Sequence, residues 1–521
     1  MNFPAYFQPA PFLSQTVTAD LCVYGGTSGG LVAAIEAGRR GLSVVVLEPS
    51  PHLGGMTAGG LGMTDIGNKS AIGGLSREFY RRLGKHYGVA EDWRFEPHVA
   101  EAVFEEWIAE TSTRVFRRQF VDLVIVKDRK ITELRTLSGL TVRGKMFIDA
   151  SYEGDLMKRA GVRYFVGRES NARFGETLNG AQIGPFHQFD APVDPYVVPG
   201  VPSSGVLPGI EPNGAYAEGA GDARIQAYNF RICLTQRPEL RIPFPKPADY
   251  DPAQYLLLKR YLATGWNEVF HKFDAIRNGK TDTNNHGGVS SDFIGQNYAY
   301  PEADYATRDK IFQQHVTYHQ GLLWCMANDC EIPAAIREPM SAWGLCRDEF
   351  VTTGGWPHAL YIRESRRMIS DVVMTESHCR WKEVAEDPVG LGAYTMDSHN
   401  CRRFVLNGRV WNEGDVQETV QRPYGIPYRS IVPARGQCEN LLVTFCLSAS
   451  HIAFGSIRME PVLMVLSQSA AIAAAIALEN GSSVQDVPYG DLRMELDAAG
   501  QILASDNQIV RAPGHAEFIE S

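Results

Sequence analysis

A glycine-rich turn between an apolar strand and an alanine-rich helix constrains this 521-residue chain most strongly. Residues 21–24 are apolar and lead directly into the turn at residues 25–30, after which the spacing of residues 31–37 is helical. A second apolar run, residues 43–47, follows and ends in Glu48. This order predicts the first strand–helix–strand unit of a parallel α/β sheet.

The turn has the composition of a dinucleotide site. Glycines let the backbone approach a pyrophosphate, whose charge then sits at the helix N-terminus. An acid about 20 residues later accepts hydrogen bonds from a ribose, and Glu48 lies 23 residues beyond Gly25. The G-x-G-x-x-G spacing is incomplete because position 27 is threonine. We expect cofactor contacts at Gly25, Gly26, Thr27, Ser28, Gly30, Glu48 and Pro49.

Gly54, Gly55 and Met56 follow the acid after a short loop. Taken alone, these glycines could form a flexible loop. A Gly-Gly pair at this distance from the ribose-binding acid nevertheless resembles that of the glutathione-reductase-like FAD proteins, in which a bare backbone runs beside the ribityl chain and the ring. The resemblance implies FAD as the cofactor.

Four further segments are similar to a large bacterial family of FAD-dependent oxidoreductases, often found alongside carbohydrate-degrading enzymes: residues 145–155, 361–368, 394–400 and 427–461. The family usually has a Gly-Gln helix start where this chain has Ser467 and Gln468. The resemblance implies that the strand end at Asp149, Ala150 and Ser151 lies beside the adenine half of FAD. It also implies that Ser450, Arg458 and Met459 lie beside the ring, where a helix opened by Glu460 and Pro461 directs its positive end.

The fold class expected from these motifs is α/β. A Rossmann-like FAD-binding domain would be assembled from residues 18–165 and 395–485, because cofactor motifs occupy both ends of the chain. An α+β substrate or capping domain, residues 166–394, would be inserted between them, and residues 486–521 would form a C-terminal extension. No second dinucleotide fingerprint is visible, so we expect an external electron acceptor.

His399 and His451 are the candidate bases, because a neutral imidazole can accept the proton of a substrate hydroxyl while hydride leaves for the flavin. Asp397 lies on the same face as His399 if the segment is extended, and Tyr428 is a further candidate. Each histidine could instead be structural. The expected substrate is small and polyhydroxylated, with a sugar-like CH–OH; an amine or CH–CH oxidoreductase, or a non-redox use of FAD, are the alternatives.

Three other patterns have simpler explanations. Residues 361–368 contain Arg363, Glu364, Arg366 and Arg367, and on a helix Arg363 and Arg367 would share one face. Their anion could be a pyrophosphate, a substrate carboxylate or an internal Glu such as Glu349, and the internal salt bridge is the commonest outcome. His315 and His319 have zinc-compatible spacing, but a third ligand is missing and no metal is expected. Residues 462–478 are apolar but short for a bilayer, and are expected to be a buried helix.

The overall charge excludes some partners. A formal net charge of −10 gives no basic face for nucleic acid, and neither a membrane anchor nor a signal peptide is expected. The nine cysteines form no C-x-x-C pair and are expected to be reduced thiols of a cytoplasmic protein. Self-association into a homo-oligomer is left open.

Overall fold

The computed structural model describes residues 4–212 and 214–504, and the predicted strand–helix–strand unit opens its largest sheet. This sheet has the order β3-β2-β1-β6-β5-β4, with β20 paired to β6. Strands β3, β2, β1, β6 and β20 are parallel, and β4 and β5 form an antiparallel extension. The strands are β1 (Gln15–Tyr24), β2 (Val44–Glu48), β3 (Arg114–Arg117), β4 (Val121–Lys127), β5 (Lys130–Thr136), β6 (Leu140–Asp149) and β20 (Leu441–Val443).

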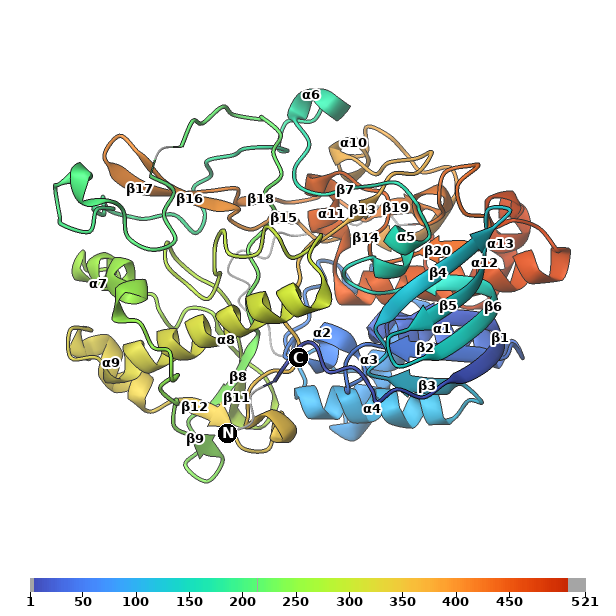
Figure 1. The fold of residues 1–521 in the computed structure, drawn as a ribbon, viewed down its shortest axis with the longest axis horizontal. Helices are drawn as coiled ribbons and strands as arrows, with labels where there is room; N and C mark the ends of the chain where they lie inside the picture. Colours follow the sequence, from blue (N-terminus) through green and yellow to red (C-terminus); the bar gives the residue numbers. More distant parts are fainter. Residues whose placement is uncertain (1–3, 213, 505–521) are drawn as a thin grey trace.

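Two helices from opposite ends of the chain pack together beside this sheet (Figure 1). Helix α1 (Ser28–Arg39) follows the turn, and α12 (Glu460–Asn480) has Pro461 in its first turn, as expected. They approach so closely that a Cβ on Gly29 would lie 2.5 Å from Ser467 Oγ. Helices α3 (Gly74–His86), α4 (Pro97–Ala109) and α13 (Tyr489–Ala498) complete this half of the molecule.

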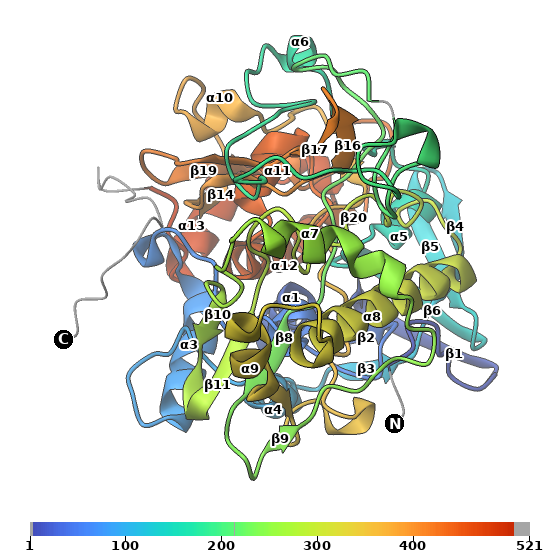
Figure 2. The ribbon, with the colours of Figure 1, turned by 90° about the vertical axis from the view of Figure 1, so that its left-hand side faces the viewer.

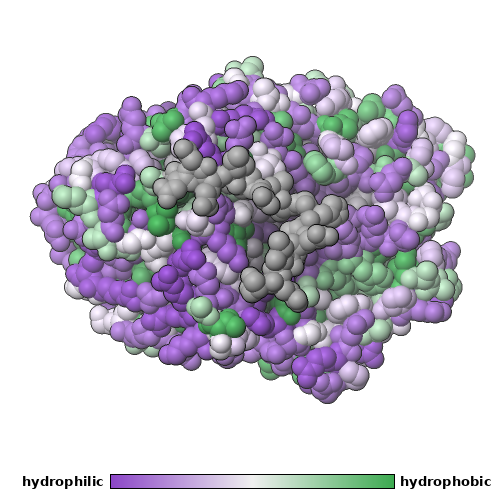
Figure 3. Space-filling view, turned by 180° about the vertical axis from the view of Figure 1, so that it is seen from behind, coloured by the Kyte–Doolittle hydropathy of each residue, from purple (hydrophilic) through white to green (hydrophobic). Residues whose placement is uncertain are grey.

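Helix α12 is long and apolar enough to cross a membrane by length and composition, the one such helix among the described residues. Within its apolar window, 94% of the residues are buried in the protein. The sequence prediction of a buried helix is therefore confirmed. The apolar residues of α12 thus lie inside the protein, and the face opposite to the view of Figure 1 is mostly hydrophilic (Figure 3).

The middle of the chain forms a second sheet with its own hydrophobic core (Figure 2). Its antiparallel strands have the order β10-β11-β8-β12-β9 and are packed against the long helix α8 (Tyr305–Asn328). The remaining elements are β8 (Ile232–Thr235), β9 (Arg241–Ile242), β10 (Phe273–Ala275), β11 (Lys280–Thr283), β12 (Gly344–Cys346), α7 (Leu256–Ala263) and α9 (Ala334–Ser341). This is an α+β unit inserted into an α/β fold; the exact domain boundaries stay predictions.

The segment at residues 361–368 is not helical, so the expectation that Arg363 and Arg367 share a helix face is wrong. Only Arg367 and Met368 form regular structure, as the short strand β13 that pairs with β7 (Tyr164–Phe165). The rest of the segment is irregular, and each arginine meets different partners. Short elements that follow it include β14 (Pro388–Gly392), β15 (Met396–Ser398) and α11 (His451–Ile457).

Candidate active site

A cavity of about 960 Å³ of empty space, part of it open to solvent, lies where β1, β2 and β6 end. Several predicted cofactor residues line it: Gly25, Thr27, Glu48, Pro49, Gly55 and Ser151. Ser50, His52, Tyr152 and His358 also line it and were not predicted. The cavity is closed on another side by the N-terminal residues Pro4, Ala5, Tyr6 and Gln8.

The turn needs its glycines for close backbone approach. Gly25 has φ +103°, and a Cβ there would lie 2.7 Å from the carbonyl carbon of Ala150. A Cβ on Gly30 would lie 1.9 Å from Gly25 O. Thr27, the residue that departs from the glycine pattern, is the N-cap of α1: its Oγ1 accepts from Gly30 N at 3.1 Å and donates to Ala150 O at 2.9 Å. Threonine therefore closes the same turn with a side chain.

Glu48 is buried at the cavity wall. Its two carboxylate oxygens accept from Gly26 N and Ser50 N, each at 2.6 Å. Burial raises the pKa of Glu48 to about 8, although these two hydrogen bonds oppose the shift. A carboxylate has further lone pairs, so Glu48 can also accept from ribose hydroxyls.

Other predicted cofactor residues support the cavity from behind. Asp149 accepts from Ser151 N and Oγ and from Met157 N, and burial raises its pKa to about 6. This fixes the strand end that presents Ser151 to the cavity, in keeping with a packing role. Gly26, Ser28, Gly30, Gly54 and Ala150 are buried around the same turn without lining the cavity.

Glu460 joins the N-termini of three helices and was missed as a site residue. Its Oε2 accepts from Ser28 Oγ on α1 and from Thr57 Oγ1 on α2 (Gly55–Ala58), each at 2.6 Å. Its Oε1 accepts from Tyr152 OH at 2.9 Å. The hydroxyl oxygen of Tyr152 in turn accepts from Met56 N at 2.8 Å. Burial raises the pKa of Glu460. The signal was present in the sequence, since Glu460 directly precedes the helix-opening proline.

A smaller pocket continues beyond Tyr152 and Ile362, which line both spaces. Its walls are Met56, Phe445, Phe454 and Leu463, with the charged groups of Arg363, Glu364 and Arg458. The predicted residues Met56 and Arg458 are therefore brought together here. The glycine turn and Glu48 at the larger cavity suit the pyrophosphate and ribose of FAD, and the aromatic-walled pocket beyond Tyr152 is in place for its flavin end.

A buried ion cluster surrounds His399. Its Nδ1 lies 2.8 Å from Asp292 Oδ2, and its Nε2 lies 3.4 Å from Asp397 Oδ2. Arg458 Nη2 donates to Asp397 Oδ2 at 3.0 Å. Asp397 and His399 thus share a face, as the extended-strand hypothesis predicts. Burial opposes ionisation of Asp397, but His399 and Arg458 hold its pKa well below the usual range.

Asp292 joins this cluster to Arg363, whose Nη2 lies 2.8 Å from Asp292 Oδ1. Burial opposes ionisation of Asp292, yet Arg363 and His399 lower its pKa to about 2. Arg363 itself is fully buried, and desolvation lowers its pKa despite Asp292. Asp292 was not singled out in the sequence, because nothing in its local pattern indicates that it meets a histidine 107 residues away.

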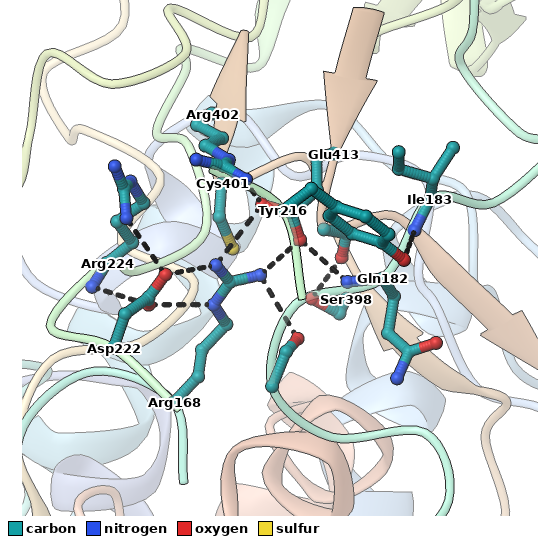
Figure 4. A network of polar contacts seen from close by, with 12 residues as sticks. Arg168, Gln182, Ile183, Tyr216, Asp222, Arg224, Ser398, Cys401, Arg402 and Glu413 are labelled. Atoms are coloured by element: carbon teal, nitrogen blue, oxygen red, sulfur yellow. Dashed lines mark hydrogen bonds and ion pairs between the residues drawn. The ribbon is translucent and has the colours of Figure 1, made fainter. Parts of the chain in front are cut away.

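His451 has both ring nitrogens engaged. Nδ1 lies 2.8 Å from Glu364 Oε2, and Nε2 lies 2.9 Å from Ser398 Oγ. Ser398 donates in turn to Gly414 O, beside a buried network in which Arg168 pairs with Asp222 and Glu413 (Figure 4). His451 thus lies in a hydrogen-bonded framework behind His399.

The structure separates the remaining predicted residues from this cluster. Tyr428 OH donates to Val484 O within the FAD-domain core. Ser450 caps α11 and donates to Glu176, and Met459 is the buried N-cap residue of α12. Glu349 pairs with Lys280 and His98, so the expectation that it pairs with the 361–368 arginines is wrong. Those arginines pair with Asp292, Asp155, Glu302, Glu169 and Glu364.

Unpaired polar atoms gather around His399. Gln226 accepts from His399 N, yet its Nε2 has no partner among the described residues, and Asn229 Oδ1 is likewise buried without a donor. The Nε atoms of Arg363 and Arg458 are also unpaired within the described structure. Buried polar groups are normally satisfied, so unpaired atoms on several residues that contact this cluster or its neighbours make it a candidate ligand site.

Comparisons with known proteins agree with this cofactor site. The sequence profile of the family described as FAD dependent oxidoreductase matches residues 20–496. The 3-oxosteroid 1-dehydrogenase of Mycobacterium tuberculosis is 45% identical over 53 residues, which is 10% of this chain and 9% of that protein.

Two solved structures are similar over part of their length. The L-amino acid deaminase from Proteus vulgaris is 14% identical, with 34% of this chain and 56% of that chain covered and a TM-score of 0.24. The L-proline dehydrogenase from P. horikoshii is 15% identical, with 31% and 59% covered and a TM-score of 0.24. This chain spans less than two thirds of each of these proteins, so none of them identifies its substrate. The family match covers most of the chain, and the protein belongs to the FAD-dependent oxidoreductases.

Proposed function

We propose that this protein oxidises a CH–OH group of a small polyhydroxylated substrate, a sugar or glycoside, and passes the hydride to flavin N5. The observation that carries the proposal is the set of unpaired polar atoms around His399. It combines donors on Gln226, Arg363 and Arg458 with an acceptor on Asn229. A hydroxyl group both donates and accepts, so a polyol satisfies such a mixture better than a carboxylate, which only accepts.

The charges of the cluster favour a neutral ligand. Arg363 is paired with Asp292, and Arg458 with Asp397, so these two cations are balanced by two anions. Tyr361 adds an aromatic ring, over which the guanidinium carbons of Arg231 and Arg363 lie at 5.4 and 5.0 Å from the ring centre. The guanidinium groups thus cover the ring, and the balanced charges with hydrogen-bonding groups of both kinds suit a sugar.

His399 is the group we propose as the base. Asp292 only accepts, so Nδ1 of His399 carries the proton of that hydrogen bond. We propose that the ring is neutral, so that Nε2, which lies 3.4 Å from Asp397 Oδ2, holds the lone pair that acts as the base. Arg458 holds the neighbouring Asp397 carboxylate. Nε2 takes the hydroxyl proton as the C–H bond gives up its hydride, and the substrate becomes a carbonyl compound. FAD supplies the two-electron acceptor, and an external acceptor reoxidises it.

The experiment is anaerobic reduction of the FAD-loaded protein by a panel of sugars, glycosides, amines and amino acids. The proposal expects loss of flavin absorbance with members of the first two classes. Reduction by amines or amino acids alone would replace the proposed substrate class, and no reduction by any class would contradict a redox role for these substrates.

A further inference from the structure

A second cavity lies inside the inserted domain, with walls from α7, α8, β8 and β11. We call it the side cavity. It holds about 520 Å³ of empty space, part of it open to solvent. One set of walls is apolar or aromatic: Leu258, Trp266, Phe273, Leu322, Leu323 and Met326. A space of this kind takes an apolar group, since burying apolar surface is favourable.

One polar atom in the side cavity lacks a partner. His319 is fully buried, and its Nδ1 lies 2.6 Å from His315 O. A carbonyl only accepts, so Nδ1 carries the hydrogen and Nε2 holds a lone pair. Nε2 makes no hydrogen bond of good geometry among the described residues, although the Ser291 backbone lies near enough to the ring to favour its protonated form. Burial lowers the pKa of His319 to about 4, so the ring is neutral at physiological pH.

This unpaired acceptor specifies part of the ligand. A buried acceptor left without a donor is costly, and a hydroxyl or N–H group would remove the cost. Burial disfavours the protonated form of the His319 ring, so the neutral ring is suited to accept a hydrogen bond from a neutral ligand. Trp266 and Phe273 offer ring faces and edges to an aromatic group. Together these features match a phenol.

The side cavity adjoins the His399 cluster along one loop. Ser290 and Ser291 line the cavity, and the next residue, Asp292, binds His399. Asn229 Nδ2 donates to Ser291 Oγ at 3.2 Å, and Asn229 Oδ1 is one of the unpaired atoms of the cluster. The side cavity and the cluster are thus joined through this loop and the Asn229 side chain, and a ligand that uses both must span them.

We propose that the side cavity is a subsite for a phenolic aglycone, so that the substrate of the His399 site is an aryl glycoside with a free phenolic hydroxyl. This rests on the proposed oxidation of a sugar or glycoside. The Nε2 lone pair of His319 accepts from the phenolic hydroxyl, and the apolar wall covers the ring.

The first test compares 4-hydroxyphenyl and methyl glucosides, in both anomers, as reductants of the FAD-loaded protein under anaerobic conditions. The hydroxyphenyl glycoside is expected to half-saturate flavin reduction at a concentration about tenfold lower. Leu323→Trp, which fills the cavity, should remove this advantage and leave reduction by the methyl glycoside unchanged. Met494→Trp, at an exposed position, is the matched control. Equal half-saturation by both glycosides in the parent protein overturns the inference but leaves the sugar proposal standing.

The second test does not require turnover. Binding of 4-ethylphenol and of ethylbenzene to the FAD-loaded protein is measured by calorimetry. The parent should bind the phenol at least tenfold more tightly, and His319→Phe should abolish this preference while retaining ethylbenzene and the parental melting temperature. Absence of phenol binding in the parent overturns the subsite. Binding of the phenol together with failure of every sugar to reduce the flavin overturns only the proposed reaction.

Discussion

Asp292 lies between His399 and Arg363, with one carboxylate oxygen 2.8 Å from His399 Nδ1 and the other 2.8 Å from Arg363 Nη2. The aspartate comes from the inserted domain and the histidine from the segment that follows it. This contact fixes the imidazole through Nδ1, whereas Nε2, the proposed base, lies 3.4 Å from Asp397 Oδ2.

Asp292→Asn is therefore expected to slow anaerobic flavin reduction about 10²-fold, because the amide can hold the opposite tautomer of His399 and cannot stabilise its cation. Bound FAD should be retained. Stopped-flow absorbance measures the rate, and Asp491→Asn, at an exposed position on α13, is the control. A parental rate would remove Asp292 from the positioning of the base.

Glu48→Gln should weaken FAD binding by about 1–3 kcal/mol, because the amide has one acceptor oxygen where the carboxyl group has two, and both of those already accept from backbone N–H groups. The change keeps the size of the side chain, and the amide oxygen can still accept from Gly26 N, although the amide nitrogen cannot accept from Ser50 N. Fluorescence titration of apoprotein with FAD gives the affinity. Unchanged affinity would show that Glu48 does not contact the ribose.

Glu48 should also make the stability of the apoprotein depend on pH. Its pKa is raised from 4.5 to about 8 by burial, so between these values the folded chain keeps a proton that the unfolded chain has lost. Stability should therefore fall as pH rises through this window and level off above about pH 8. Urea unfolding of parent and Glu48→Gln apoprotein should show a flatter pH dependence in the variant. The same pH dependence of the unfolding free energy in parent and variant would contradict a raised pKa at Glu48.

Glu460→Ala should destabilise the protein by about 1–3 kcal/mol, since Ser28, Thr57 and Tyr152 all donate to this carboxylate. The matched control is Glu479→Ala on the exposed last turn of the same helix. Chemical unfolding compares the two variants. If Glu460→Ala were as stable as Glu479→Ala, the hydroxyl groups of Ser28, Thr57 and Tyr152 would have found other hydrogen-bond partners.

The thiols should not be needed for turnover. All nine cysteines are free, and Cys330 is the exposed one. Cys233 and Cys346 face each other on β8 and β12 with 3.7 Å between their sulfur atoms, but both are buried. Mild alkylation should modify Cys330 and leave the rate of flavin reduction unchanged. If alkylation abolished flavin reduction while the protein stayed folded, the hypothesis that the flavin accepts both electrons without a thiol would be contradicted.

The local motifs of the cofactor site could be predicted from sequence, and its long-range contacts could not. The glycine turn, Glu48 and the proline that opens α12 are each recognised from residues close together in the chain. The strand, the helix and the cavity wall could therefore be predicted from local sequence. Asp292 meets His399 only through the fold of the inserted domain. The expectation of a helix at 361–368 was wrong because its charged spacing suits a helix, whereas in the structure the segment is mostly irregular and each arginine is buried against a separate carboxylate.

The most direct test of the account is the rate of anaerobic flavin reduction in His399→Gln, measured with a sugar or glycoside that reduces the parent protein. Glutamine can keep a hydrogen bond to Asp292 but cannot act as a base near neutral pH. The account predicts normal FAD content and a reduction rate about 10²–10⁴-fold below the parent. A variant that holds FAD and is reduced at the parental rate would contradict the assignment of His399 as the base.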